Sequence, residues 1–299
     1  MKLIPLSLAF ILVACSSTPN KEKSKPVDEI SSSDFKKDKP LQPKEVSDFY
    51  SVGPKSLSPA LEDETLDRYT AEEIAQLADM NDPLLELSVR CSKRDFEKAF
   101  GLASRIFNKY QKIAAYWNQV ANCHLNQGSH RKALLFYNKA LEVSPGYVPA
   151  LNNIGVLYSR QGQDQKALVA FERANAQSKF AKTPRYNLAK TYLTYGMAEP
   201  ALPIFQGLLS TSPADVDLNY AVGSCYFLMS DYQRALSYYQ KIPSGLWENA
   251  EYGLNISLAL KKVGRSDDAK KVFGSVDKPK SHELKQYYSS IAAQLGEGK

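Results

Sequence analysis

Small and apolar residues recur along the chain with a constant period of 34 residues. An aromatic residue stands four positions after five of the six alanines that mark the period, and a small residue stands twelve positions before five of them. The six marker residues are Ala99, Ala133, Ala167, Ala201, Ala235 and Ala269. A period of this length, kept over six units without insertion or deletion, predicts a tandem array of one repeated supersecondary unit.

Each unit is predicted to be a pair of antiparallel helices. The small residue of the first helix and the marker alanine of the second allow the two helix axes to approach closely. Five positions before the alanine, four of the six units carry a Gly, which can end the first helix in the left-handed conformation. Because one hairpin cannot cover its own apolar face, the units are expected to stack around a shared core.

These positions resemble the tetratricopeptide repeat, with units that begin at about residues 80, 114, 148, 182, 216 and 250. The resemblance covers residues 80–283 and implies an all-α fold, a right-handed superhelix (α-solenoid) of six helical hairpins. A capping box at Thr70 and Glu73 predicts a flanking helix within 66–79. Ser281 is expected to begin a C-terminal capping helix over 284–299.

The first fourteen residues have the pattern of a secretory signal. A Lys at position 2 precedes an apolar stretch, and residues 12–15 (Leu-Val-Ala-Cys) resemble a bacterial lipobox. The resemblance implies cleavage after residue 14 and a covalent lipid on Cys15. Ser16 is similar to an outer-membrane sorting signal, so the expected location is the outer membrane, on its periplasmic face. Residues 15–65 are rich in Ser, Pro and charged residues, and we expect a disordered tether there.

Catalytic and metal-binding motifs are not found in the sequence. It has no glycine-rich nucleotide motif, no GxSxG and no HExxH, and its three His and four Cys include no CxxC pair. The sequence therefore predicts a non-enzymatic protein without a cofactor other than the lipid. Cys91 and Cys123 occupy neighbouring positions of successive first helices. They can form a disulfide in an oxidising compartment, but buried reduced thiols are the favoured interpretation.

Polar side chains recur on the first helices, at positions that line the inner groove in tetratricopeptide arrays. An Asn side chain both donates and accepts hydrogen bonds, so a row of them can bind the backbone of an extended peptide. This row resembles the asparagine ladder of some peptide-binding members of the family. The alternative is that these Asn side chains are solvated helix surface. The predicted contact residues are Asn118, Asn122, Asn153, Asn187, Lys190 and Asn255. Asn153 and Asn187 are expected to be exposed.

The family's clamp for a C-terminal carboxylate is not predicted here. Its two Asn positions are present at Asn122 and Asn153, but its cationic positions are not. Residues 80–299 carry 28 Lys and Arg against 18 Asp and Glu. This excess favours an acidic partner, unless the cations only solvate helix faces.

The sequence predicts an outer-membrane-anchored scaffold or adaptor that holds a peptide or protein subunit in its groove, and it predicts no nucleic-acid partner. In outline it resembles the pilotin lipoproteins of type IV pili. Assembly of an envelope machine is therefore expected, whether the pilus secretin, a motility complex or an outer-membrane assembly complex. Two alternatives are an adaptor of a periplasmic protease or peptidoglycan enzyme, and a receptor for an anionic envelope polymer.

Overall fold

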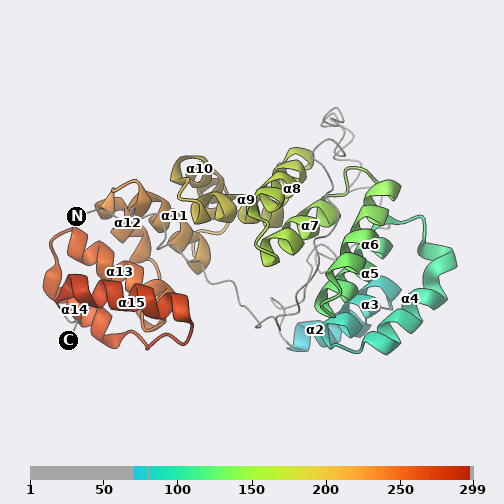
Figure 1. Cartoon of the computed structure of the whole chain (residues 1–299), viewed down its shortest axis with the longest axis horizontal. Helices are drawn as coiled ribbons and strands as arrows, with labels where there is room; N and C mark the ends of the chain where they lie inside the picture. Colours follow the sequence, from blue (N-terminus) through green and yellow to red (C-terminus); the bar gives the residue numbers. More distant parts are fainter. Residues whose placement is uncertain (1–70, 80, 297–299) are drawn as a thin grey trace. The chain divides into compact units, whose positions relative to one another are not determined.

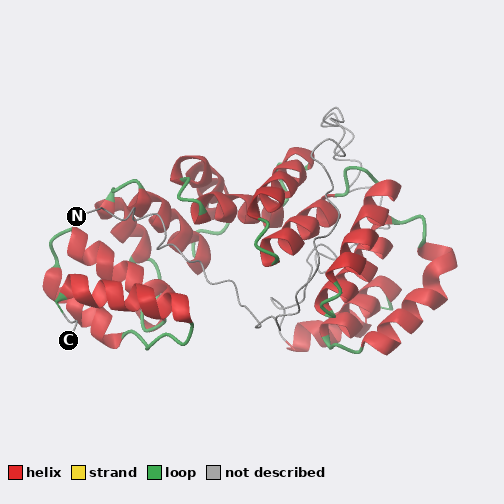
Figure 2. Ribbon diagram, in the orientation of Figure 1, coloured by secondary structure: helices red, strands yellow, loops and turns green. Residues whose placement is uncertain are grey.

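The computed structural model describes residues 71–79 and 81–296, which are helical with connecting loops and contain no strand (Figures 1 and 2). In chain order, the described helices begin with α2 (Ala71–Asp79), α3 (Pro83–Ser92), α4 (Phe96–Tyr110), α5 (Ala114–Asn126), α6 (His130–Val143), α7 (Val148–Arg160) and α8 (Asp164–Gln177). They are followed by α9 (Lys182–Thr194), α10 (Ala198–Leu209), α11 (Val216–Leu228), α12 (Tyr232–Tyr239), the 3₁₀ turn η3 (Ser244–Leu246), α13 (Ala250–Lys262), α14 (Ser266–Ser275) and α15 (His282–Leu295).

The predicted all-α repeat fold is confirmed. Helices α3 to α14 form six successive hairpins, with α2 before the first and α15 after the last. Among the described residues, one compact unit ends at Asn187 and a second begins at Leu188. The predicted signal, Cys15, the tether and Thr70 lie outside the described residues. No described helix has the length and apolar character needed to cross a membrane.

The turn inside every hairpin has the same backbone conformation. The predicted Gly positions have a positive φ, for example 82° at Gly128 and 86° at Gly264. The two hairpins without Gly keep this conformation, with φ of 60° at Arg94 and 62° at Ser230. The stacking of the helices therefore imposes the left-handed turn even where the residue does not favour it.

The close approach of the two helices depends on the small residue of the first one. A Cβ atom added at Gly155 would lie 2.5 Å from Cε1 of Phe171, the aromatic residue four positions after the marker alanine. Gly223 and Tyr239 are related in the same way, again at 2.5 Å. The ring of the second helix thus occupies the space that a side chain on the first helix would need.

The first hairpin departs from this pattern. Its first helix carries the fully buried Leu87 at the small position, and a disulfide joins Cys91 of α3 to Cys123 of α5. The Cα atoms of the two cysteines are 5.0 Å apart, within the usual range. The favoured prediction of reduced thiols is therefore wrong, because stacking brings these positions of successive first helices to bonding distance.

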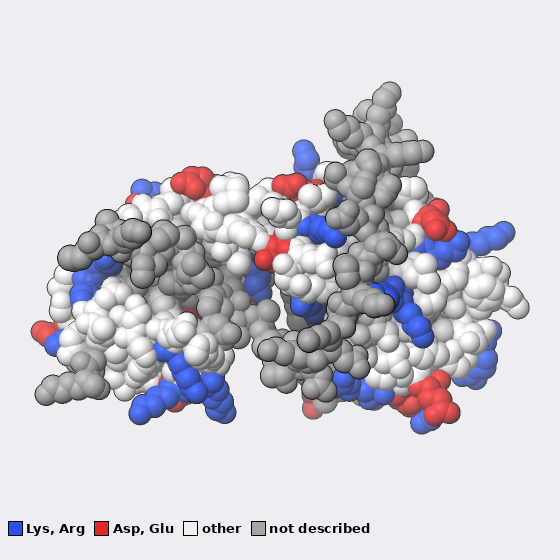
Figure 3. All heavy atoms as spheres, viewed as in Figure 1, with Lys and Arg blue, Asp and Glu red and all other residues white. Residues whose placement is uncertain are grey.

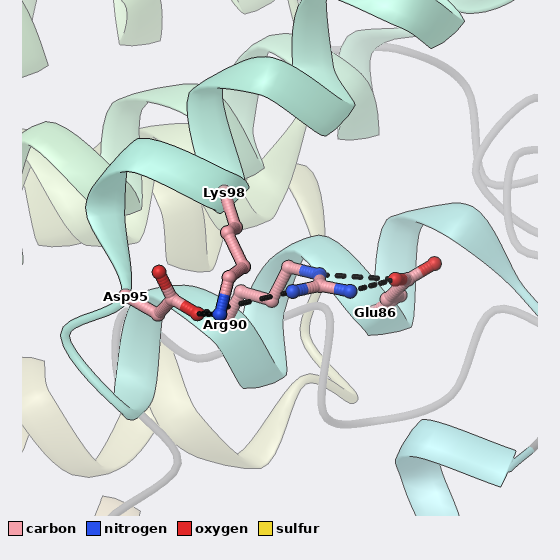
Figure 4. A network of polar contacts seen from close by, with 4 residues as sticks. All are labelled: Glu86, Arg90, Asp95 and Lys98. Atoms are coloured by element: carbon pink, nitrogen blue, oxygen red, sulfur yellow. Dashed lines mark hydrogen bonds and ion pairs between the residues drawn. The ribbon is translucent and has the colours of Figure 1, made fainter.

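Arg90 of the first hairpin stands where the third to fifth hairpins have a Tyr. It forms an ion pair with Glu86 at 2.6 Å and lies 3.9 Å from Asp95, which also pairs with Lys98 at 3.1 Å (Figure 4). The network links α3 to the start of α4. Because these side chains are about a third exposed or more, it contributes little to the free energy of unfolding.

The C-terminal helix α15 covers the last hairpin. Its N-terminus is capped by Ser281, whose Oγ accepts a hydrogen bond from the Leu284 amide at 3.2 Å, and Gly296 ends it with φ 76°. Ile291 and Leu295 are buried against α13 and α14. The predicted capping helix thus begins at His282 and shields the apolar end of the hairpin stack.

The tight contact at Gly155 gives a stability prediction. Gly155→Ala is expected to lower the free energy of unfolding by roughly 1–3 kcal/mol, because the added methyl group overpacks against Phe171. Gly101 lies within α4 in open space and provides the matched control. Gly101→Ala is expected to raise the stability by about 0.5–1 kcal/mol, since Ala is the better helix former. Urea unfolding of both variants checks this, and a stabilised Gly155→Ala protein would contradict the contact.

Candidate functional site

A row of amide side chains follows the first helices α5, α7 and α9 in the N-terminal unit. We call this set the amide row. Its members are Asn118, Gln119, Asn122, Asn152, Asn153 and Asn187. Five of the six are at most 3% exposed, and only Asn187 is half-buried.

The amides of the row bind one another. Asn153 donates from Nδ2 to Oδ1 of Asn118 at 3.2 Å and to Oδ1 of Asn122 at 3.1 Å. Its own Oδ1 accepts a hydrogen bond from Nδ2 of Asn152 at 3.0 Å. Both donor hydrogens of Asn153 are therefore used inside the protein.

The row continues to both neighbouring hairpins. At one end, Asn187 donates to Oδ1 of Asn152 at 2.9 Å. At the other end, Oε1 of Gln119 accepts hydrogen bonds from Asn122 Nδ2 at 3.2 Å and from Ser88 Oγ of α3 at 2.7 Å. The first helices of four successive hairpins are thus connected by side-chain hydrogen bonds.

One contact of the row follows the repeat period. The amide at the sixth position of a unit donates to an oxygen at the fifth position of the preceding unit. It joins Asn153 to Asn118 and Asn187 to Asn152, and in the C-terminal unit Asn255 donates to the Tyr220 hydroxyl. Because both partners are fixed by the helix register, the bond recurs wherever the two side chains are suitable.

The structure corrects the expected exposure of the predicted contact residues. Asn153 was expected on the surface but is 0% exposed, and Asn118, Asn122 and Asn255 are also buried. The physical reason is that amides spaced by one repeat reach each other, which satisfies their polar groups and permits burial. Asn187 and Lys190 are half-buried, and a role for them in binding a partner stays a prediction.

Two members of the row, Gln119 and Asn152, were not among the predicted contact residues. Asn152 could have been found, because it stands one repeat after Asn118 at the same fifth position. Its place between Asn153 and Asn187 makes it the connecting member of the row.

The C-terminal unit has a smaller polar cluster at the equivalent positions. Asn255 donates to the Tyr220 hydroxyl and accepts from the Tyr287 hydroxyl of α15, and all three side chains lie in or beside the core. Burial raises the pKa of the Tyr220 and Tyr287 hydroxyls, so both stay protonated. The Tyr287 hydroxyl donates to Asn255, whereas the Tyr220 hydroxyl accepts from it. Tyr287 thereby links the capping helix to the last hairpin.

Acidic groups stand on the first helices of this unit. Burial and the neighbouring carboxylate of Asp217 raise the pKa of Glu251, and the ammonium of Lys190 opposes this rise. Asp217 accepts a hydrogen bond from the Tyr252 hydroxyl at 2.9 Å. The excess of positive charge in the sequence is therefore not uniform, and the expected acidic partner stays a prediction.

Groups with chemical reactivity are sparse in the part of the chain that the structure describes. Burial and the Glu199 carboxylate raise the pKa of the Cys225 thiol to about 12, so it does not form a thiolate near neutral pH. Within residues 71–79 and 81–296, no three His, Cys, Asp or Glu side chains come together as potential metal ligands. The recognisable feature of these residues is polar packing between helices.

Comparison with protein families identifies the repeat. Two models of the tetratricopeptide repeat match the chain, one at residues 114–147 and the other at residues 136–169. The chain therefore carries tetratricopeptide repeats, as the spacing of its alanines indicated. No curated protein matches it significantly.

Solved structures share the fold at low sequence identity. PilF of Pseudomonas aeruginosa is 17% identical with a TM-score of 0.61, over 74% of this chain and 99% of that one. YrrB, a tetratricopeptide protein with an unusual peptide-binding site, is 19% identical with a TM-score of 0.53, over 63% and 97%. The Cut9–Hcn1 structure is 16% identical with a TM-score of 0.56, over 76% of this chain, which spans only 46% of the matched chain.

These likenesses show the fold alone. Proteins built of tetratricopeptide repeats are generally non-enzymatic scaffolds, and the fold of this chain is that of a scaffold for protein–protein interaction. The partner and the cellular place of such a scaffold do not follow from the fold.

The amide row predicts a loss of stability on mutation. Asn153→Ala removes three hydrogen bonds and leaves the Asn152 amide with an unsatisfied donor in a buried site. We expect the free energy of unfolding to fall by roughly 1–3 kcal/mol. Asn108→Ala, on the exposed face of α4, is the control and is expected to change it by less than about 0.5 kcal/mol. Equal stability of the two variants in urea unfolding would show that the row contributes nothing.

A buried histidine predicts a dependence of stability on pH. The His124 ring lies between the rings of Phe100 and Phe136, with centroids 4.5 and 5.1 Å away. Burial, and then the Lys132 ammonium, lower its pKa in the folded state. The neutral ring thus stabilises the fold above the ordinary pKa of about 6.5, and this stability is lost as the pH falls through the lower folded-state value.

We therefore expect the melting temperature to fall by a few degrees, roughly, between pH 7 and pH 5. His124→Tyr restores the residue type found at this position in the next three hairpins and should reduce the fall. His282→Gln is the control, because His282 is exposed. A fall of the same size in His124→Tyr as in the parent would assign the effect to other groups, among them His130, whose pKa is also lowered by burial and by Arg160.

Proposed function

We propose that this protein is an exported lipoprotein that presents a tetratricopeptide scaffold at the periplasmic face of the outer membrane. The observation that carries the proposal is the lipobox-like sequence ending at Cys15, placed between an apolar leader and a long polar segment. The proposed anchor is a covalent lipid on Cys15, with no other cofactor. Several acyl chains on one residue give lasting attachment, since each buried methylene contributes about 0.8 kcal/mol.

The disulfide supports export of the chain. Disulfides persist in oxidising compartments and are rare in the reducing cytosol. The bond between Cys91 and Cys123 joins buried sulfur atoms, at 2% and 0% exposure, in a position that serves packing rather than catalysis. It is independent of the leader sequence, because it lies in the folded repeats.

The proposed task of the scaffold is to hold a peptide or a protein subunit during the assembly of an envelope machine. The peptide-binding site of YrrB supports a ligand of this class for the fold. Asn187 and Lys190 of α9 are the proposed contact residues, and the hydrogen bond from Asn187 to the buried Asn152 supports the position of that helix. The outline shared with pilotin lipoproteins favours the secretin of type IV pili, with motility and outer-membrane assembly complexes as the wider class.

Membrane fractionation tests the proposal. Cys15→Ser is expected to abolish metabolic labelling with radioactive palmitate and to release the protein from the membrane fraction, because the thiol that accepts the lipid is gone. Ser16→Asp should keep the label but move the protein from the outer to the inner membrane fraction. Palmitate labelling that persists in Cys15→Ser, or an unlabelled parent protein, would refute the anchor.

A further inference from the structure

The turns of the six hairpins differ in polarity between the two units. The residue just before the positive-φ position is Lys93, Gln127 or Gln161 in the first three hairpins and Tyr195, Met229 or Val263 in the last three. In the fourth hairpin, Met197 follows the turn Gly. Tyr195, Met197 and Met229 are 47%, 44% and 43% exposed.

An open pocket of about 430 Å³ lies at this turn of the fifth hairpin. Its lining is mixed: Met229, Tyr232 and Val263 are apolar, and Lys262 lies beside them at the end of α13. The polar residues Ser230, Asp231 and Gln233 complete it. The Tyr232 ring is held edge-on against Phe227, with centroids 5.2 Å apart. The turns at the ends of α11 and α13 thus share one open hollow of mixed polarity, and we call these residues the turn edge.

The charges around the hollow leave one cation available to a partner. Asp231 pairs with Arg234 at 2.6 Å and also caps α12, and Arg265 pairs with Asp268 at 2.7 Å. Among the described residues, Lys262 has no carboxylate within ion-pair distance, and its ammonium lies 5.8 Å from the centre of the Tyr232 ring. The apolar side chains of Met229 and Tyr232, with the Lys262 ammonium beside them, are complementary to an apolar side chain followed by a carboxylate.

We infer that the turn edge is a docking surface for an extended acidic segment of a partner protein, which places an apolar side chain against Met229 and Tyr232 and a carboxylate at Lys262. The inference rests on the proposed scaffold function and adds a second surface to it. Methionine suits such a site, because its flexible thioether adapts to different side chains. The proposed contacts lie in the turns and do not include Asn187 or Lys190 of α9.

Selection from a phage-displayed library of random 12-residue peptides tests the inference. The target is the full mature chain with Cys15→Ser, which keeps it free of lipid. Enriched peptides are expected to combine an aromatic or aliphatic residue with a nearby Asp or Glu. Fluorescence anisotropy of the synthetic peptides then measures affinity. Met229→Lys is expected to weaken binding by about tenfold or more, and Lys262→Glu by about three- to tenfold.

Lys270→Glu, an exposed charge reversal on α14, is the matched control and should leave the affinity unchanged. Melting curves of all variants establish that each one is folded. Failure to enrich any peptide, enrichment of basic peptides, or equal affinity for Met229→Lys and the parent would overturn the inference. Palmitate labelling and membrane fractionation of lipidated Met229→Lys are independent readouts, so failure at the turn edge is distinguishable from failure of the proposed function.

Discussion

The fold depends on a helix contact at which one partner has almost no side chain. At Gly155 and Gly223 the aromatic ring of the second helix occupies the volume that a methyl group would need. The ring buries a large apolar area and also fixes the distance between the helix axes. Where successive hairpins repeat this geometry, each presents the same surface to the next, and the stacked hairpins can share one core. In the hairpin of Gly223 the same geometry accommodates the left-handed turn at Ser230, although the residue there is not Gly.

Hydrogen bonds between neighbouring hairpins fix the register in which the hairpins pack. An apolar interface is compatible with small shifts of one hairpin along another, whereas a bond such as that from Asn187 to Asn152 is compatible with one register. The bonds of Asn153 within the row satisfy its amide where water is excluded. The amide row therefore acts as a polar seam that positions the first helices, and any ligand on that face meets side chains carried by helices of fixed spacing.

The sequence is sufficient to predict the hairpins, because their signals are local. The alanine period, the aromatic residue four positions on and the turn Gly all act within one unit, and Ser281 caps α15 through its own near neighbours. The burial of Asn153 and the disulfide of Cys91 and Cys123 were not predicted correctly. Both depend on the distance between successive units, which no single unit specifies. An Asn on a helix has the same local pattern whether it faces water or another amide one repeat away.

The first and the last hairpin are completed by different means, because each lacks different contacts. At the C-terminal end, α15 supplies apolar side chains and the Tyr287 hydroxyl in place of a further hairpin. At the N-terminal end, the first hairpin has Leu87 at the small position and Arg90 at the position of the usual Tyr, so it lacks two of the contacts that define the repeat. The covalent bond from Cys91 to the next hairpin fixes this unit where packing is least regular. A hairpin held in this way depends on an oxidising environment, and for that reason the least regular repeat provides physical support for the proposed export of the chain.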